Sequence, residues 1–143
     1  SAVAHAETEV GSIDILINNS GVSTTQRLQD VSPDDYDFMF NTNVKGAFFV
    51  AQEVGKRMLA RATGSAPGNY TGGRIINVAS VYGTLAPHRA LYPEAQSFDL
   101  PSYGASKAGL LGLTRHLAAI LGPQGITVNA MVPSRSWLEL RVA

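Results

Sequence analysis

The amino-acid sequence predicts an α/β fold, part of a doubly wound parallel sheet with a β-α-β-α-β core. Three short runs of apolar, largely β-branched residues are typical of strands, and two long stretches with helix start or stop signals separate them. Each strand run is apolar at nearly every position, as in strands that are buried on both sides of a parallel sheet. Because parallel strands need crossover connections, helices are expected to cover the faces of the sheet.

The first strand and the first long helix are expected in the N-terminal part of the chain. The strand comprises Ile13–Ile17 and ends at a polar turn, residues 18–21. A helix then runs from about Pro33 to about Ala60, because Ser32 provides an N-cap, a proline follows and two aspartates stand in the first turn. A loose apolar stripe along this helix predicts the core residues Phe38, Val44, Phe48, Ala51 and Val54.

Two further strands and a second helix follow. The glycine-rich segment Arg61–Gly73 is expected to be a surface loop, and Arg74–Ser80 is expected to be the second strand. The second helix begins near Ser102 and stops at Gly122, which a proline follows. The third strand is Ile126–Val132, and another proline closes it.

Length, charge and composition exclude several classes of protein. The 143 residues suffice for about one domain, and 11 basic side chains balance 11 acidic ones, so no basic excess is available for nucleic acid. There is no cysteine, which excludes disulfides and thiolate sites, and His5, His88 and His116 show no metal-ligand spacing. Neither a signal peptide nor a membrane span is visible, so a cytoplasmic protein is expected.

The most informative pair is Tyr103 and Lys107, in Tyr-Gly-Ala-Ser-Lys at the start of the second helix. Residues four positions apart lie on one helical face, one turn from each other. A free tyrosine is protonated at neutral pH and is a poor base, but a nearby ammonium favours the phenolate. The pair is therefore a candidate general acid and base, although a tyrosine and a lysine on any helix surface would show the same spacing.

Other polar residues are expected at the same edge of the sheet. Ser80 ends the second strand and the turn over residues 18–21 follows the first, where open α/β sheets bind ligands. Asn43 lies inside the first helix in an Asn-Thr-Asn cluster, which weakens the helix locally. Taken singly, these residues are equally typical of turns, strand ends and solvated helix faces.

Taken together, they resemble the short-chain dehydrogenase/reductase family over roughly residues 1–134. Five motifs occur in the family's order: Asn18-Asn19-Ser20-Gly21 for its N-N-A-G, Asn43 for its helix asparagine, Ser80 for its strand-end serine, Tyr103 and Lys107 for its Y-x-x-x-K, and Val128-Asn129-Ala130 with Pro133 for its next strand and loop. Five ordered matches are far more specific than any single motif. The resemblance implies a Rossmann-like sheet.

The resemblance also implies an oxidoreductase that uses NAD or NADP and transfers hydride between the nicotinamide and a carbonyl or secondary alcohol. Tyr103 would exchange a proton with the substrate oxygen, Ser80 would hydrogen-bond that oxygen, and Lys107 would bind the nicotinamide ribose. Asn43 would hold a water that links Lys107 to solvent. Asn18, Asn19, Ser20 and Gly21, with Pro133, complete the cofactor-binding set. Members of the family pair the two helices across subunits, so a homodimer or homotetramer is expected.

Three departures from the family pattern matter. The glycine-rich G-x-x-x-G-x-G turn for the cofactor pyrophosphate is absent, so roughly 90 residues of β-α units are expected before residue 1, and residues 1–143 form only the catalytic portion of the domain. Ser134 and Leu138 replace the family's glycine and threonine, and residues 135–143 form a divergent tail. Ser80 and Tyr103 are 23 residues apart, which indicates an insertion over residues 84–100.

Three functional interpretations remain open. The favoured one is a dehydrogenase of a sugar acid or polyol, because the insertion carries Tyr, His, Glu and Asp side chains. The second is a 3-ketoacyl-thioester reductase. The third is an inactive fragment that acts only as a binding or oligomerisation module, because the phosphate anchor of the cofactor is missing. The insertion is equally well a wall of the substrate pocket or a tolerated surface loop.

Overall fold

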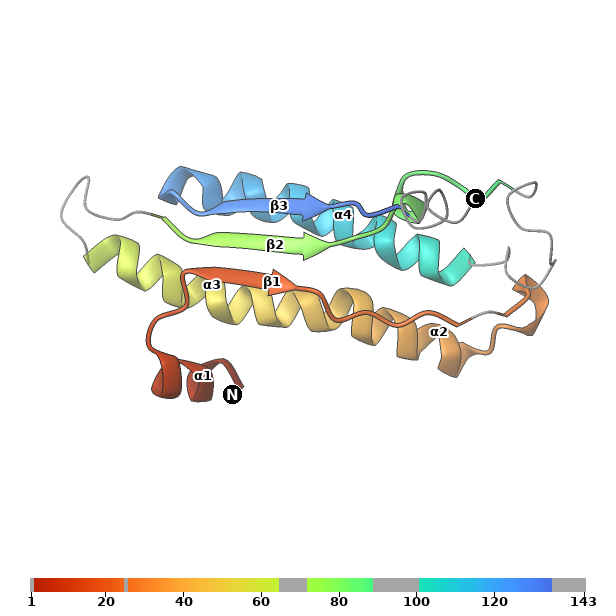
Figure 1. Cartoon of the computed structure of the whole chain (residues 1–143), viewed down its shortest axis with the longest axis horizontal. Helices are drawn as coiled ribbons and strands as arrows, with labels where there is room; N and C mark the ends of the chain where they lie inside the picture. Colours follow the sequence, from red (N-terminus) through yellow and green to blue (C-terminus); the bar gives the residue numbers. More distant parts are fainter. Residues whose placement is uncertain (1, 25, 65–71, 89–100, 135–143) are drawn as a thin grey trace, which may run out of the picture.

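A sheet of three parallel strands lies at the centre of the fold (Figure 1). The computed structural model describes residues 2–24, 26–64, 72–88 and 101–134. The strands are β1 (Ile15–Asn18), β2 (Arg74–Val78) and β3 (Thr127–Met131), in the order β1-β2-β3. Ile15 pairs with Arg74, and Arg74 pairs with Thr127. The carboxyl ends of the strands therefore meet at one edge, and the predicted parallel α/β sheet is confirmed.

Helices alternate with the strands, as the sequence predicts. They are α1 (Ala2–Val10), α2 (Pro33–Phe40), α3 (Ala47–Gly64) and α4 (Pro101–Leu121), with a π-helical turn η2 (Asn41–Gly46) between α2 and α3 and short 3₁₀ turns η1 (Leu28–Asp30), η3 (Val81–Gly83) and η6 (Gly122–Gln124). Figure 1 shows α3 behind β1 and α4 behind β3, on the same side of the sheet. Within the described ranges, no helix is both long enough and apolar enough to cross a membrane.

The start of α2 follows the sequence signals. The Ser32 hydroxyl oxygen accepts a hydrogen bond from the Asp35 backbone N–H at 3.1 Å, and the Asp35 carboxylate accepts one from the Ser32 backbone N–H at 3.4 Å, which completes a capping box. Hydrogen bonds from the Ser32 and Gln26 side chains hold the pKa of Asp35 below its usual value. The predicted N-cap is therefore confirmed, and this carboxylate serves the helix start.

The end of α3 differs from the prediction. The helix continues to Gly64, so residues 61–64 belong to it rather than to the predicted loop. Arg61 explains the extension, because its guanidinium donates to the Ile13 carbonyl at 2.5 Å and lies 3.5 Å from the Asp14 carboxylate. These contacts attach the last turns of α3 to the segment before β1, and such tertiary contacts override weak local propensity.

The polar cluster around Asn43 forms the π turn η2, so the predicted local weakening of the helix is confirmed. The stripe of predicted core residues is wrong at two positions. Phe38 and Phe48 are 55% and 39% exposed, whereas their neighbours Met39 and Ala47 are buried. The buried positions of α3 repeat every three or four residues from Ala47, so Phe48 lies beside the buried stripe and not within it.

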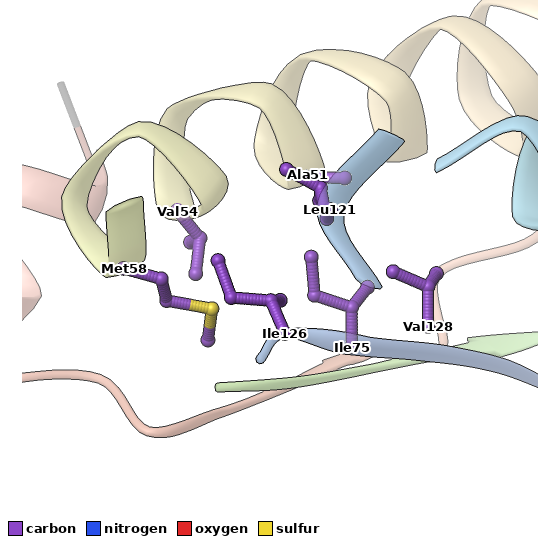
Figure 2. Packing of buried hydrophobic residues seen from close by; sticks show 7 residues of the cluster. All are labelled: Ala51, Val54, Met58, Ile75, Leu121, Ile126 and Val128. Atoms are coloured by element: carbon purple, nitrogen blue, oxygen red, sulfur yellow. The ribbon is translucent and has the colours of Figure 1, made fainter. Parts of the chain in front are cut away.

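The hydrophobic core lies between the sheet and the pair α3 and α4 (Figure 2). It consists of Ala51, Val54, Met58, Ile75, Leu121, Ile126 and Val128. On the opposite face of the sheet, Ile15, Ile17 and Met131 are 57%, 58% and 54% exposed. The prediction that helices cover the sheet on its faces is thus met on one face only in the part of the chain described, although the strand residues are apolar on both.

Two sequence-based expectations fall largely outside the described residues. Residues 89–100, most of the expected insertion, are not among them, and neither is the divergent tail, residues 135–143. Residues 84–88 and Pro133 are described, so the structure shows where the insertion begins and how the loop after β3 starts.

Candidate active site

The carboxyl edge of the sheet gathers the residues singled out from the sequence. β1 ends at Asn18, β2 ends at Val78, and Ser80 is the N-cap of η3. Ser80 is 7% exposed, and its hydroxyl oxygen accepts a hydrogen bond from the backbone of the turn at 3.3 Å. The N–H groups on both sides of Ser80 donate to carbonyls at and after the end of β3, at 2.8 and 3.2 Å, the second of them to Pro133. Ser80 is therefore held on a rigid support.

Lys107 and Tyr103 lie together beside this edge. Lys107 is 4% exposed, and its Nζ donates to the Val78 carbonyl at 2.9 Å. The same Nζ lies 5.7 Å from the centroid of the Tyr103 ring, within the range of a cation–π contact. Burial lowers the pKa of Lys107 below its ordinary value, because removal from water disfavours the ammonium. The pair predicted from the helical spacing thus shares one face and one environment.

The loop after β1 approaches this pair at Gly21. A Cβ atom at Gly21 would stand 3.2 Å from the Lys107 Nζ and 3.4 Å from the Asn43 Oδ1, so a side chain here would enter the space in front of the ammonium. Asn43 is completely buried, and its side chain binds the backbone of Val22, the residue after Gly21. The Asn43 Oδ1 accepts from the Val22 N–H at 2.8 Å, and the Asn43 Nδ2 donates to the Val22 carbonyl at 2.9 Å. The structure thereby brings Gly21, Asn43 and Lys107 together.

Asn18 has its amide turned into the protein. Its Nδ2 donates to the Asn77 Oδ1 at 2.9 Å and to the Ala47 carbonyl at 3.3 Å, which uses both amide hydrogens. Asn19 and Ser20 are exposed. Within this turn, Gly21 is the residue at which a Cβ atom would approach Asn43 and Lys107, and cofactor binding by all four residues stays a prediction.

Sequence reasoning missed three buried polar residues behind the site. Asn77 in β2 donates to the Thr114 hydroxyl at 2.9 Å, and Ser106 in α4 accepts from Asn43 at 2.9 Å. The signal was available, because Asn77 interrupts an apolar strand and Ser106 and Thr114 stand on an otherwise apolar helix. A buried polar side chain needs a partner, so each of them indicates another polar residue nearby.

A cavity of about 490 Å³ lies next to this cluster. Leu28, Pro101, Gly104, Ala105, Ala108 and residues 82–87 line it, and none of these side chains is charged. Tyr103, Lys107, Ser80 and Asn43 do not line it. The α4 residues that line the cavity are Pro101, Gly104, Ala105 and Ala108. Their spacing puts them on one face of the helix, next to the face that carries Tyr103 and Lys107. Residues 84–87, at the start of the expected insertion, therefore line a cavity beside the site.

The model of the short chain dehydrogenase family matches residues 1–136. This match includes every residue of the cluster and all three strands. The chain belongs to the short-chain dehydrogenase family. The resemblance seen in the motifs is confirmed.

Several longer short-chain dehydrogenases are similar to this chain. It is 37% identical over 128 residues to 2-dehydro-3-deoxy-D-gluconate 5-dehydrogenase from Escherichia coli (strain K12), covering 90% of this chain and 44% of the relative. It is 34% identical over 126 residues to 3-oxoacyl-(acyl-carrier-protein) reductase FabG from Staphylococcus epidermidis, covering 87% and 43%. The crystal structure of a gluconate 5-dehydrogenase from Burkholderia cenocepacia J2315, in complex with NADP and tartrate, matches with a TM-score of 0.76 at 32% identity, covering 92% and 44%. The chain thus spans less than half the length of these relatives.

The residues present fit the nicotinamide end of a dinucleotide cofactor. An ammonium has three N–H donors, and the Val78 carbonyl takes one of those on Lys107, so donors remain for ribose hydroxyls. Glycine at position 21 keeps the space before Nζ free of a side chain. Within the ranges described, no group of three His, Asp or Glu side chains could hold a metal ion.

Proposed function

We propose that the chain is the catalytic portion of an NAD- or NADP-dependent oxidoreductase acting on a carbonyl or secondary alcohol. The observation that carries the proposal is the pair Tyr103 and Lys107, with a buried ammonium 5.7 Å from the phenol ring at the sheet edge that also holds Ser80. A tyrosine beside a buried cation is suited to proton transfer. In this proposal residues 1–143 belong to a larger domain, and residues 135–143 are its divergent tail.

Each side chain has a role in that proposal. When bound, the nicotinamide supplies or accepts the hydride. The Tyr103 hydroxyl donates a proton to the carbonyl oxygen in reduction and removes it in oxidation. The Ser80 hydroxyl oxygen accepts a hydrogen bond from the Tyr82 N–H in η3. The hydroxyl proton of Ser80 is therefore free to bond the same substrate oxygen and to stabilise the charge that develops there. Lys107 binds the ribose hydroxyls, and its Nζ lies 5.7 Å from the centroid of the Tyr103 ring.

Asn43 is proposed to hold a water between Lys107 and solvent. Both hydrogens of its amide are already donated, to the Val22 carbonyl and to the Ser106 hydroxyl. The water would therefore be the donor, and it would bind to an oxygen of Asn43, either Oδ1 or the backbone carbonyl in the π turn.

For the substrate we propose a sugar acid or polyol. Two of the relatives are named for gluconate-type substrates, which supports this class. A 3-ketoacyl thioester is the alternative, supported by the similarity to a 3-oxoacyl-(acyl-carrier-protein) reductase. The third interpretation, an inactive fragment that only binds or oligomerises, is supported by the absence of a glycine-rich phosphate-binding turn from the sequence.

We also propose a cytoplasmic homodimer or homotetramer. Phe49 of α3, Phe38 of α2 and Ile120 of α4 are 53%, 55% and 63% exposed. Exposed large apolar side chains on these helices offer surface that another subunit can cover. Sedimentation of the whole protein tests this, and a monomer at micromolar concentration would overturn it.

The test of the activity compares Tyr103→Phe with the wild type in the whole protein, following NADH or NADPH absorbance with sugar acids, polyols and a 3-ketoacyl thioester. Loss of the proton donor should lower kcat by about 10² to 10⁴. Tyr36→Phe is the matched control, because Tyr36 lies on α2, is 43% exposed and stacks on Phe40 through its ring alone. Turnover retained in Tyr103→Phe would refute the assignment of Tyr103.

The fragment interpretation has its own test. Titration of NADH into the 143-residue chain, followed by nicotinamide fluorescence, should show weak binding or none, because the sequence lacks a glycine-rich phosphate-binding turn. Micromolar binding by the chain would show that the other residues suffice and would contradict this expectation.

A further inference from the structure

Two buried hydroxyls on α4 bond in the same way to two different parts of the fold. Ser106 accepts from the Asn43 Nδ2 at 2.9 Å and donates to the Tyr103 carbonyl at 2.8 Å. Thr114 accepts from the Asn77 Nδ2 at 2.9 Å and donates to the Leu110 carbonyl at 2.8 Å. Ser106 is 0% and Thr114 is 6% exposed. The Thr114 bond reaches β2, whereas the Ser106 bond reaches the π turn.

The Ser106 bond is the direct link between Asn43 and the first turns of α4. The Asn43 side chain makes three hydrogen bonds, two with the backbone of Val22 and one with Ser106. The residue before Val22 is Gly21, where a Cβ atom would stand 3.2 Å from the Lys107 Nζ. The Ser106 hydroxyl thus connects Asn43, which holds the loop at Gly21 and Val22, to the backbone carbonyl of Tyr103.

We propose that Ser106 is a positioning residue, which keeps the Tyr103 and Lys107 side chains in register with the loop at Gly21. The inference rests on the proposed function, in which these two side chains do the chemistry. Without the hydroxyl, one N–H of the completely buried Asn43 amide loses its partner, and an unsatisfied buried donor costs free energy until it moves. Rotation of the amide breaks its bonds to Val22 and frees the loop.

The first experiment measures amide hydrogen exchange by NMR in Ser106→Ala and in the wild type, using the whole protein. Alanine is smaller and is a better helix former, so the variant folds. The Val22 N–H, which donates to Asn43, should exchange about tenfold faster relative to the core amides of β2. In Thr114→Val, which removes the equivalent hydroxyl, this ratio should stay at the wild-type value. An unchanged ratio in Ser106→Ala, or an equal rise in both variants, overturns the proposal.

The second experiment measures the kinetics of hydride transfer in the same variants. A displaced phenol affects the transition state more than ground-state binding, so kcat of Ser106→Ala should fall about tenfold with KM within about twofold. A rise in KM alone would contradict a positioning role. If the wild-type protein lacks oxidoreductase activity, the proposed function fails, and the exchange result at Val22 still decides whether Ser106 holds the loop.

Discussion

Gly83 offers a direct test of how closely η3 is seated on α4. A Cβ atom at this position would lie 2.8 Å from the carbonyl carbon of Lys107, 2.9 Å from its oxygen and 3.0 Å from the nitrogen of Ala108. All three are backbone atoms of α4, so no side-chain rotation relieves the contact. To reach the ordinary distance of 3.4 Å, the turn must retreat by about 0.6 Å. Gly83→Ala is therefore expected to reduce the free energy of unfolding by about 1–3 kcal/mol.

The displacement also reaches the proposed catalytic serine. The Gly83 N–H donates to the Ser80 carbonyl at 2.9 Å, so a retreating turn pulls Ser80 away from Tyr103. A shift of this size should lower kcat by about tenfold or more. Urea unfolding measures the stability, and NADH or NADPH absorbance measures the rate. Gly64→Ala is the control, because a Cβ there meets nothing within 4 Å, and it should be neutral or stabilising by up to about 1 kcal/mol. Equal stability of the two variants would refute the close seating.

Two further predictions concern charge and exposure. Because burial lowers the pKa of Lys107 below 10.5, the unfolded chain binds more protons than the folded one between the two pKa values. The free energy of unfolding should therefore rise with pH toward 10.5. Urea titrations at a series of alkaline pH values measure this rise, and Lys107→Met should lack it. The same rise in Lys107→Met would assign the pH dependence to another group. Ile17 lies on the exposed face of β1, so Ile17→Lys should raise the solubility of the isolated chain and reduce its binding of a hydrophobic dye, with the circular dichroism unchanged. Leu16 packs against the core, so Leu16→Lys should unfold the chain. Unfolding by Ile17→Lys would show that this face is covered.

Local signals predicted the element types and most of their bounds. The capping residues at Ser32 and the stop at Gly122 act on neighbours within four residues, so the sequence alone contains the interaction. The strands start and end within two residues of their predicted limits for a similar reason, because polar and proline residues flank each apolar run.

The errors arise where distant contacts decide. The end of α3 depends on Arg61 reaching the segment before β1, 48 positions away. The exposure of Phe38 and Phe48 depends on which side of each helix packs against the rest of the fold, and apolar residues on several sides leave that open in the sequence. For the candidate site, the ordered motifs predicted which residues meet at the sheet edge but not their partners. That Asn18 bonds to Asn77 inside the protein follows from the parallel pairing of β1 and β2.

The π turn also bears on how the chain tolerates changes in length. A regular helix turns by about 100° per residue, so the loss of one residue within α3 would rotate all that follows and bring exposed side chains toward the sheet. The turn Asn41–Gly46 already contains one residue more than a regular turn. Deletion of one residue there returns the segment to an α-helix and leaves both flanks facing as before. A one-residue deletion at this position is therefore expected to preserve the fold while it moves Asn43 away from Val22 and Ser106, so the length of the chain here is set by the hydrogen bonds of Asn43 rather than by the packing of α3.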